Sequence, residues 1–174
     1  RLIVDYLCRS GEPPCYFAMP LVNNNASARQ DAYVEAMQQF KMTPEIVPVT
    51  DARSWDFEKF GYDEALRILK AEGFATKTVL CANDRVAFGV IAAAYQLGLK
   101  VGHGSDCDMR VAGHDDHPLS RYACPPITTV AQNYNEIGRL AIELLLERLD
   151  EESSAKPGSG RILLNAELML RSSA

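Results

Sequence analysis

The sequence predicts an α/β fold, in which a parallel β-sheet carries helices on both faces. Short strand-like segments alternate with helical segments along the 174 residues. The strand-like segments are continuous apolar runs, and this pattern is typical of parallel strands that are buried on both faces. Apolar residues make up 47% of the chain and charged residues 24%, so it is long enough and apolar enough to bury one hydrophobic core.

The N-terminal part of the chain contains predicted helices and strands in alternation. Residues 1–9 place apolar side chains on one side of a helix, which stops near Gly11. Residues 15–19 form a short apolar strand. A polar loop leads into a helix over residues 26–41, where large apolar side chains recur at helical spacing. Residues 45–49 form the next predicted strand.

The middle of the chain repeats this alternation. A helix over residues 62–72 is closed by Gly73, in the usual position after a last turn. Residues 78–82 form a strand with no polar residue after its first position. Asn83 can cap the helix that follows, and Gly98 ends it. Because this helix is apolar on nearly all sides, we expect it to be well buried.

The last part of the chain begins with a strand over residues 109–113 and a short extended piece over residues 127–131. The clearest amphipathic helix follows over residues 135–149. Residues 151–160 are charged and then rich in Ser, Gly and Pro, which predicts a flexible connection. Residues 161–170 close the chain as one or two strands.

Charge and hydropathy argue against two classes of partner. The formal net charge is −5, whereas a surface that grips nucleic acid is basic. The same balance gives no reason to expect an anionic membrane surface as partner, and no apolar run approaches the about 20 residues that span a bilayer. The chain starts at Arg1 without a methionine and directly in a helix, so we expect it to be a fragment of a longer protein.

The five cysteines predict neither a disulfide framework nor a zinc site. Their number is odd, and no two of them have Cys-x-x-Cys spacing. Cys15 and Cys81 lie inside apolar strand-like runs, so we expect buried reduced thiols. Reduced thiols suit a cytoplasmic protein.

Polar side chains follow each predicted strand, at the edge of the sheet where open parallel α/β folds bind ligands. Amide, guanidinium and carboxylate groups near an indole suit a ligand with several hydroxyls and an apolar face, such as a sugar, a nucleoside or a nucleobase. In chain order these side chains are those of Asn23, Asn24, Asn25 and Arg29; Asp51, Arg53, Trp55 and Phe57; Asn83 and Asp84; His114, Asp115 and Asp116; Gln132 and Asn133.

Each of these residues also has a purely structural interpretation. Asn83 can be a helix cap alone, Trp55 can anchor the edge of the core, and Asp115 can simply form a turn. Arg29 stands in the first turn of its predicted helix, where a cation opposes the helix dipole, and this favours a functional role. The argument for a site therefore depends on the convergence of these residues at one edge of the sheet.

Three stretches resemble the LacI/GalR family of bacterial transcription regulators. Residues 79–90 are similar to the strand, Asn-Asp and helix segment of that family. Residues 111–132 resemble its Gly-aromatic-Asp-Asp turn and the later Pro-Pro-Leu-Thr-Thr-Val-x-Gln run, here Pro-Pro-Ile-Thr-Thr-Val-Ala-Gln. Residues 27–33 are similar to Ser-x-x-Arg-x-x-Gly-Phe. The three stretches occur in the family's order and, together, extend over most of the chain.

The resemblance implies a fold like that of type I periplasmic sugar-binding proteins, with an effector bound between two α/β subdomains. Residues 1–131 would form the C-terminal subdomain. Residues 132–160 would be a helix and linker that cross toward the N-terminal subdomain, and residues 161–174 would return. The first part of that subdomain and the DNA-binding head would lie outside this chain. We then expect the apolar stripe of the crossing helix to be exposed or paired with another chain.

The resemblance also implies residue roles and partners. A sugar-like effector, or a nucleoside or nucleobase, would favour one arrangement of the subdomains in a cytoplasmic homodimer. That arrangement would control operator binding through the absent head, with no cofactor. His114 stands where the family has Phe or Tyr, and Ala32 where it has Gly. The implied effector contacts are Arg29, Asn83, Asp115 and Gln132, with Trp55 or Phe57 as the stacking aromatic and Asn25 as a polar loop position.

Two other classes of function fit the sequence less well. A periplasmic sugar-binding protein of a transport system would share the fold, but five cysteines argue against it. An enzyme is not expected, because the sequence contains no dinucleotide fingerprint, P-loop or nucleophile elbow. The His-Asp-Asp-His run at residues 114–117 offers no ready metal geometry, so neither catalytic nor metal-binding residues are predicted.

Overall fold

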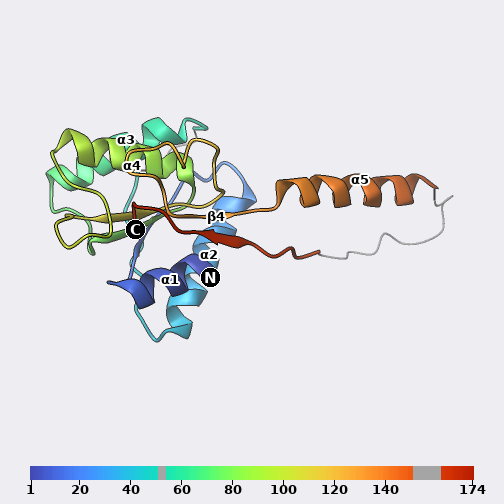
Figure 1. The fold of residues 1–174 in the computed structure, drawn as a ribbon, viewed down its shortest axis with the longest axis horizontal. Coiled ribbons are helices and arrows are strands. Elements are labelled where there is room, and N and C mark those ends of the chain that lie inside the picture. Colours follow the sequence, from blue (N-terminus) through green and yellow to red (C-terminus); the bar gives the residue numbers. More distant parts are fainter. Residues whose placement is uncertain (51–53, 151–161) are drawn as a thin grey trace.

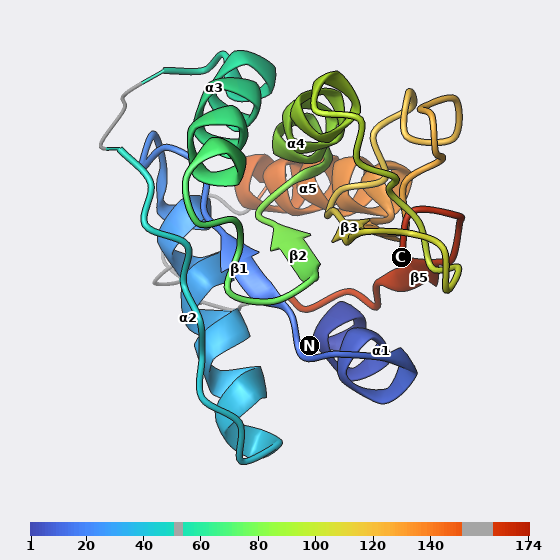
Figure 2. The same cartoon turned by 90° about the vertical axis from the view of Figure 1, so that its left-hand side faces the viewer.

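A three-stranded parallel sheet forms the centre of the molecule (Figures 1 and 2). The computed structural model describes residues 1–50, 54–150 and 162–174. The strands are β1 (Cys15–Phe17), β2 (Thr78–Cys81) and β3 (Arg110–Ala112), and they lie side by side in that order. Every residue of β1 and β2 is buried, as the continuous apolar runs predicted.

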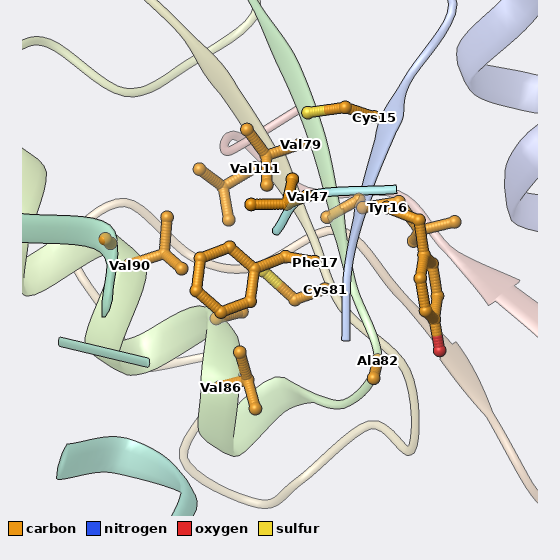
Figure 3. Packing of buried hydrophobic residues seen from close by; sticks show 14 of the residues in the cluster. Cys15, Tyr16, Phe17, Val47, Val79, Cys81, Ala82, Val86, Val90 and Val111 are labelled. Carbon is orange, nitrogen blue, oxygen red and sulfur yellow. The ribbon is translucent and has the colours of Figure 1, made fainter. Parts of the chain in front are cut away.

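Helices cover both faces of this sheet, which confirms the predicted fold class. The helices α1 (Leu2–Ser10) and α2 (Asn24–Gln39) lie on one face, and α3 (Phe57–Lys70) and α4 (Asp84–Gln96) lie on the other (Figure 1). In the core, Phe17 points toward α4, whereas Tyr16 leaves β1 on the opposite side (Figure 3). Cys15 and Cys81 are buried in this core, and both are free thiols.

The prediction of a strand over residues 45–49 is wrong. Only Ile46 pairs there, in a single parallel bridge to Tyr16. The Tyr16 N–H donates to the Glu45 carbonyl at 2.8 Å, and the Val47 N–H donates to the Tyr16 carbonyl at 2.9 Å. A longer parallel ladder would need the Val49 N–H to donate to the Ala18 carbonyl, but β1 ends at Phe17 and the pairing stops with it.

Two helices begin earlier than predicted because their caps lie further upstream. The Asp56 side chain accepts from the Lys59 N–H, and α3 therefore begins at Phe57 instead of residue 62. The Asn23 side chain accepts from the second and third N–H groups of α2. Arg29 thus stands in the second turn of its helix and not in the first.

The helices α3 and α4 approach each other at two glycines. A Cβ on Gly89 would lie 2.3 Å from the Glu58 carbonyl oxygen, and one on Gly61 would lie 2.4 Å from the Val86 carbonyl oxygen. Both contacts are with backbone, which cannot rotate away. Glycine therefore allows the two helices to pack at this distance.

Gly89→Ala is expected to lower the free energy of unfolding by about 1–3 kcal/mol, because the added methyl group forces the two helices apart. The matched control is Gly138→Ala in the last helix, where an added Cβ meets nothing within 4 Å. There the substitution should be neutral or stabilising by up to about 1 kcal/mol. Urea unfolding of both variants measures the difference, and equal effects would contradict the packing argument.

The C-terminal elements form a second, antiparallel pair of strands and a long helix. Strand β4 (Thr129–Ala131) pairs with β5 (Glu167–Met169), with Val130 opposite Leu168. Between them α5 (Tyr134–Asp150) projects away from the body of the molecule (Figure 1). The predicted helix over 135–149 is confirmed, and residues 161–170 contribute one strand among their described positions. The predicted connection over 151–160 lies outside the described residues.

The outer surface of α5 is rich in exposed apolar side chains. Leu149 is 71% and Ile142 57% exposed, and Leu145 and Leu146 are more than half exposed. The apolar stripe expected for this helix therefore has no cover within the described chain. None of the described helices is both long enough and apolar enough to cross a membrane.

Candidate ligand-binding site

A bidentate ion pair between Arg29 and Asp115 lies at the carboxyl ends of the central strands. Arg29 Nη2 donates to Asp115 Oδ1 at 2.6 Å, and Nη1 donates to Oδ2 at 3.0 Å. Arg29 Nη1 also donates to the carbonyl of Ala82, the residue after β2, at 2.7 Å. Arg29 of α2 thus crosses the end of β2 and reaches Asp115 in the turn after β3. The predicted convergence of these two residues is present in the structure.

Gln132 joins the same carboxylate from the end of β4. Its Nε2 donates to Asp115 Oδ1 at 2.6 Å. His114 Nδ1 lies 3.0 Å from the same oxygen, where a protonated Nδ1 donates to the carboxylate. The Tyr134 hydroxyl donates to the Asp115 carbonyl at 2.8 Å. Asp115 is therefore the centre of a polar cluster that draws on three segments distant in sequence.

The electrostatics of the cluster favour an ionised Asp115. Burial alone would raise the pKa of this carboxyl group, but hydrogen bonds from His114 and Arg29 and their positive charges outweigh it. The net effect lowers the pKa of Asp115 below its ordinary value of 3.8. A carboxylate and a guanidinium that are about three-quarters buried can each hold neighbouring hydroxyls of a ligand through charge-assisted hydrogen bonds.

The lowered pKa of Asp115 predicts a pH dependence of stability. A depressed folded-state pKa contributes stability above the unfolded value of 3.8, and this contribution is lost as the pH falls through the lower folded-state pKa. The difference in free energy of unfolding between wild type and Asp115→Asn should therefore be constant near neutral pH and shrink below pH 3.8. Urea titrations across this range measure it, and a difference that grows on acidification would contradict the assignment.

The turn that carries Asp115 has an unusual backbone. Asp115 has φ 108° and Asp116 has φ 49°, and such positive values are uncommon for residues with a side chain. Asp116 is held by Arg171, whose Nη2 donates to its Oδ1 at 2.6 Å, with both side chains more than four-fifths buried. The C-terminal segment after β5 thereby fixes the turn that aims Asp115 at Arg29.

The two predicted asparagines occupy different environments. Asn83 is buried, and its Oδ1 accepts from the Val86 N–H at 2.8 Å, so it caps α4. Its Nδ2 points to the sulfur of Met19 at 3.2 Å, and it directly follows Ala82, whose carbonyl binds Arg29. Asn25 is exposed and stands four residues before Arg29, on the same face of α2.

Trp55 stands apart from this cluster in the described part of the chain. The residue is 61% exposed, and its ring lies against Phe57 with ring centroids 5.8 Å apart. Phe57 is buried under the guanidinium of Arg85, whose Cζ lies 5.0 Å from the ring centroid. Asp51 and Arg53, also expected near the strand ends, lie outside the described residues. Among the described residues, no three His, Cys, Asp or Glu side chains gather closely enough to bind a metal ion.

The model of the periplasmic binding protein-like domain family matches residues 6–174. The chain belongs to this family. It is 34% identical over 158 residues to the HTH-type transcriptional repressor PurR of Haemophilus influenzae, an alignment that covers 88% of this chain and 44% of PurR. It is also 34% identical over 156 residues to the ribose operon repressor of Escherichia coli K12, covering 89% of this chain and 44% of that repressor.

Solved structures agree with this assignment. This periplasmic binding protein-like domain superposes on the lac repressor dimer bound to operator and the anti-inducer ONPF with a TM-score of 0.82 at 26% identity, covering 99% of this chain and 56% of that chain. A LacI-family regulatory protein from Chloroflexus aggregans gives a TM-score of 0.78 at 29% identity, with 99% and 58% covered. The resemblance to LacI/GalR regulators is confirmed. These relatives are repressors, so the comparisons support neither of the two alternatives, an enzyme or a periplasmic transport protein.

In this periplasmic binding protein-like domain, sequence reasoning also missed the structural role of the buried carboxylate of Asp84. Asp84 is fully buried, and its carboxylate accepts from the hydroxyls of Ser120 and Thr129, both at 2.6 Å, and from the His117 N–H at 2.7 Å. Gly113 is needed beside it, because a Cβ there would lie 2.0 Å from Asp84 Oδ1. Asp84 thus ties the start of α4 to the loop after Asp115 and to β4.

Proposed function

We propose that this domain senses a small-molecule effector for a DNA-binding transcription regulator of the LacI/GalR family. The observation that carries the proposal is the cluster of Arg29, Asp115 and Gln132 at the carboxyl ends of the strands. An ionised carboxylate and a guanidinium, both mostly buried, suit vicinal hydroxyls on a ligand. The effector class is accordingly a sugar or sugar derivative, or a nucleoside or nucleobase.

The chain spans less than half the length of the curated relatives it matches, so the remaining parts of the machinery are also proposed. Residues 1–131 and 161–174 belong to one effector-binding subdomain, and residues 132–160 lead to a second one. A groove of about 450 Å³ between α5 and residues 162–166 supports this division. Gln132 lines that groove and also binds Asp115, so the proposed effector site and the groove are contiguous.

We further propose that the regulator works in the cytoplasm as a homodimer and that a separate head binds operator DNA. The net charge of −5 makes this domain unsuited to bind DNA phosphates itself. Effector binding would favour one arrangement of the two subdomains and so alter how the dimer presents its heads. Trp55 and Asn25 are proposed to complete the effector site when the second subdomain closes over it.

Calorimetric titration of the full-length gene product with ribose, galactose, glucose 6-phosphate, adenosine and adenine tests the proposal. One compound is expected to bind saturably and to change the fluorescence of Trp55, the single tryptophan of this chain. The same compound should change the affinity for DNA fragments that the protein enriches from its own genome. If a folded protein binds none of these compounds, the assigned effector site is wrong.

A further inference from the structure

The turn formed by Asp115 and Asp116 has positive φ at both residues. The values are 108° and 49°, in a region that residues with a Cβ rarely adopt. Such a conformation costs free energy and persists only where neighbouring groups hold it in place. Any contact that restrains this turn also acts on Asp115, whose carboxylate binds Arg29.

Arg171 provides such a contact from the C-terminal segment. The chain returns to the body of the molecule through β5, and Arg171 follows shortly after that strand (Figure 1). Its Nη2 donates to Asp116 Oδ1 at 2.6 Å, and its Nη1 donates to the Ile127 carbonyl at 2.8 Å. The side chains of Arg171 and Asp116 are only 13% and 14% exposed, so solvent screens this ion pair weakly.

The backbone around Arg171 is itself anchored. The Arg171 N–H donates to Thr128 Oγ1 at 3.0 Å. The N–H groups of the next two residues both donate to the Pro126 carbonyl, at 3.1 and 3.0 Å. Arg171 is also the only side chain among the described residues that binds the Asp116 carboxylate. The guanidinium therefore connects the turn to a fixed part of the fold.

The ion pair acts on the candidate site through the chain alone. Within the described residues, Arg171 and Asp116 form no hydrogen bond to Arg29, to Gln132 or to the Asp115 carboxylate. Asp116 is, however, the immediate neighbour of Asp115. Because Asp115 Oδ1 accepts from both Arg29 and Gln132 at 2.6 Å, a shift of the turn would lengthen both hydrogen bonds.

We propose that the Asp116–Arg171 ion pair is a positioning pair for the effector site, which keeps Asp115 directed at Arg29 without touching the effector. This inference rests on the proposed function and deepens it. It gives the C-terminal segment a role in recognition, because this segment supplies the arginine. A pair that works in this way changes effector affinity through Asp115, apart from any effect on stability.

The first test is the effector affinity of Arg171→Met in the full-length gene product, measured with the panel compound that binds wild type. Methionine is of similar length but has no N–H to donate, so the dissociation constant should rise about tenfold. The double variant Arg171→Met/Asp116→Ala also removes the unpaired carboxylate, and it gives the answer if the single variant does not fold. It should show a loss of the same order. Wild-type affinity in these variants would overturn the proposal.

A double-mutant cycle with Asp115→Ala separates positioning from general destabilisation. In that background Arg171→Met should raise the dissociation constant by less than about twofold, because the residue through which it acts is gone. An undiminished tenfold loss would show that Arg171 affects the fold as a whole, and the proposal would fail.

Arg67→Met is the matched control. Arg67 also binds a buried carboxylate and a backbone carbonyl, since its Nη2 donates to Glu64 Oε2 at 2.8 Å and to the Pro48 carbonyl at 2.9 Å. It lies on α3 and bonds to no member of the cluster around Asp115. Arg67→Met should therefore change the dissociation constant by less than about twofold. A loss equal to that of Arg171→Met would contradict a specific positioning role.

Crystal structures of the effector-free wild type and Arg171→Met give an answer that needs no effector. In the variant, the distance from Arg29 Nη2 to Asp115 Oδ1 should exceed about 3.5 Å, the limit of a hydrogen bond, instead of 2.6 Å. An unchanged turn with this hydrogen bond intact would overturn the proposal. If the turn shifts as expected but no panel compound binds wild type, the proposed function fails and the positioning of Asp115 by Arg171 stands.

Discussion

Asp115→Ala is expected to weaken effector binding by about 30-fold or more. The substitution removes the acceptor for Arg29 and Gln132 and leaves a mostly buried guanidinium without its counter-charge. Truncation of one partner of a buried, hydrogen-bonded charge pair costs about 2–5 kcal/mol in binding, which corresponds to about 30-fold to several thousand-fold. Calorimetric titration of the full-length gene product with the panel compound that binds wild type measures this loss.

A matched control separates this effect from the loss of any surface charge. Asp106 also forms an ion pair, with Lys100, but its side chain is 76% exposed. Solvent-exposed ion pairs contribute little to the stability of a fold, so the Asp106→Ala variant should bind the compound with the affinity of the wild type. Undiminished binding by Asp115→Ala would show that the cluster around this carboxylate is structural and that the effector binds elsewhere.

Asp84→Ala is expected to lower the free energy of unfolding by about 2–4 kcal/mol, the largest stability effect predicted for this domain. The carboxylate accepts three hydrogen bonds in a fully buried site, and alanine would leave Ser120, Thr129 and the His117 N–H without an acceptor. The exposed Asp63, which pairs with Lys59 on α3, provides the control. Asp63→Ala should change the unfolding free energy by less than about 0.5 kcal/mol in urea titrations.

The pH dependence of the Asp84 effect should be opposite in sign to that of Asp115. Burial is the largest influence on Asp84 and raises its pKa above 3.8, in spite of the hydrogen bonds it accepts. A raised folded-state pKa contributes stability that is complete below the unfolded value and is lost as the pH rises through the folded value. The loss of unfolding free energy caused by Asp84→Ala should therefore grow as the pH falls toward 3.8. If this loss of unfolding free energy disappears on acidification, the raised pKa assigned to Asp84 is wrong.

The features that the sequence predicted correctly follow from local pattern and parallel topology. Continuous apolar runs indicate buried parallel strands, and the carboxyl ends of such strands meet at one edge. Arg29, Asp115 and Gln132 could therefore be expected together, although they are far apart in the chain. Asn83 is a helix cap, as one of its two interpretations required, and its contact with an effector stays a prediction.

The features that escaped sequence reasoning depend on non-local contacts or single backbone groups. The hydroxyl partners of Asp84 lie 36 and 45 residues away, so no local pattern reveals them. The Tyr16 hydroxyl lacks a partner among the described residues because of the face of β1 from which its ring projects, and in a continuous apolar run the sequence does not distinguish the two faces. Residues 45–49 form only one bridge because β1, their partner, ends at Phe17, and the local apolar pattern of residues 45–49 does not reveal the length of that partner.

The geometry of α5 has a mechanical consequence. The helix contains 17 residues and is therefore about 25 Å long, and its only described attachment to the body is at its first turn. That attachment includes the Tyr134 hydroxyl on the Asp115 carbonyl and the Gln132 amide on the Asp115 carboxylate. Asp115 therefore binds both the proposed effector contact Arg29 and the segment that begins α5. In the proposed two-subdomain regulator, a change at this one residue would reach the effector site and the crossing helix together.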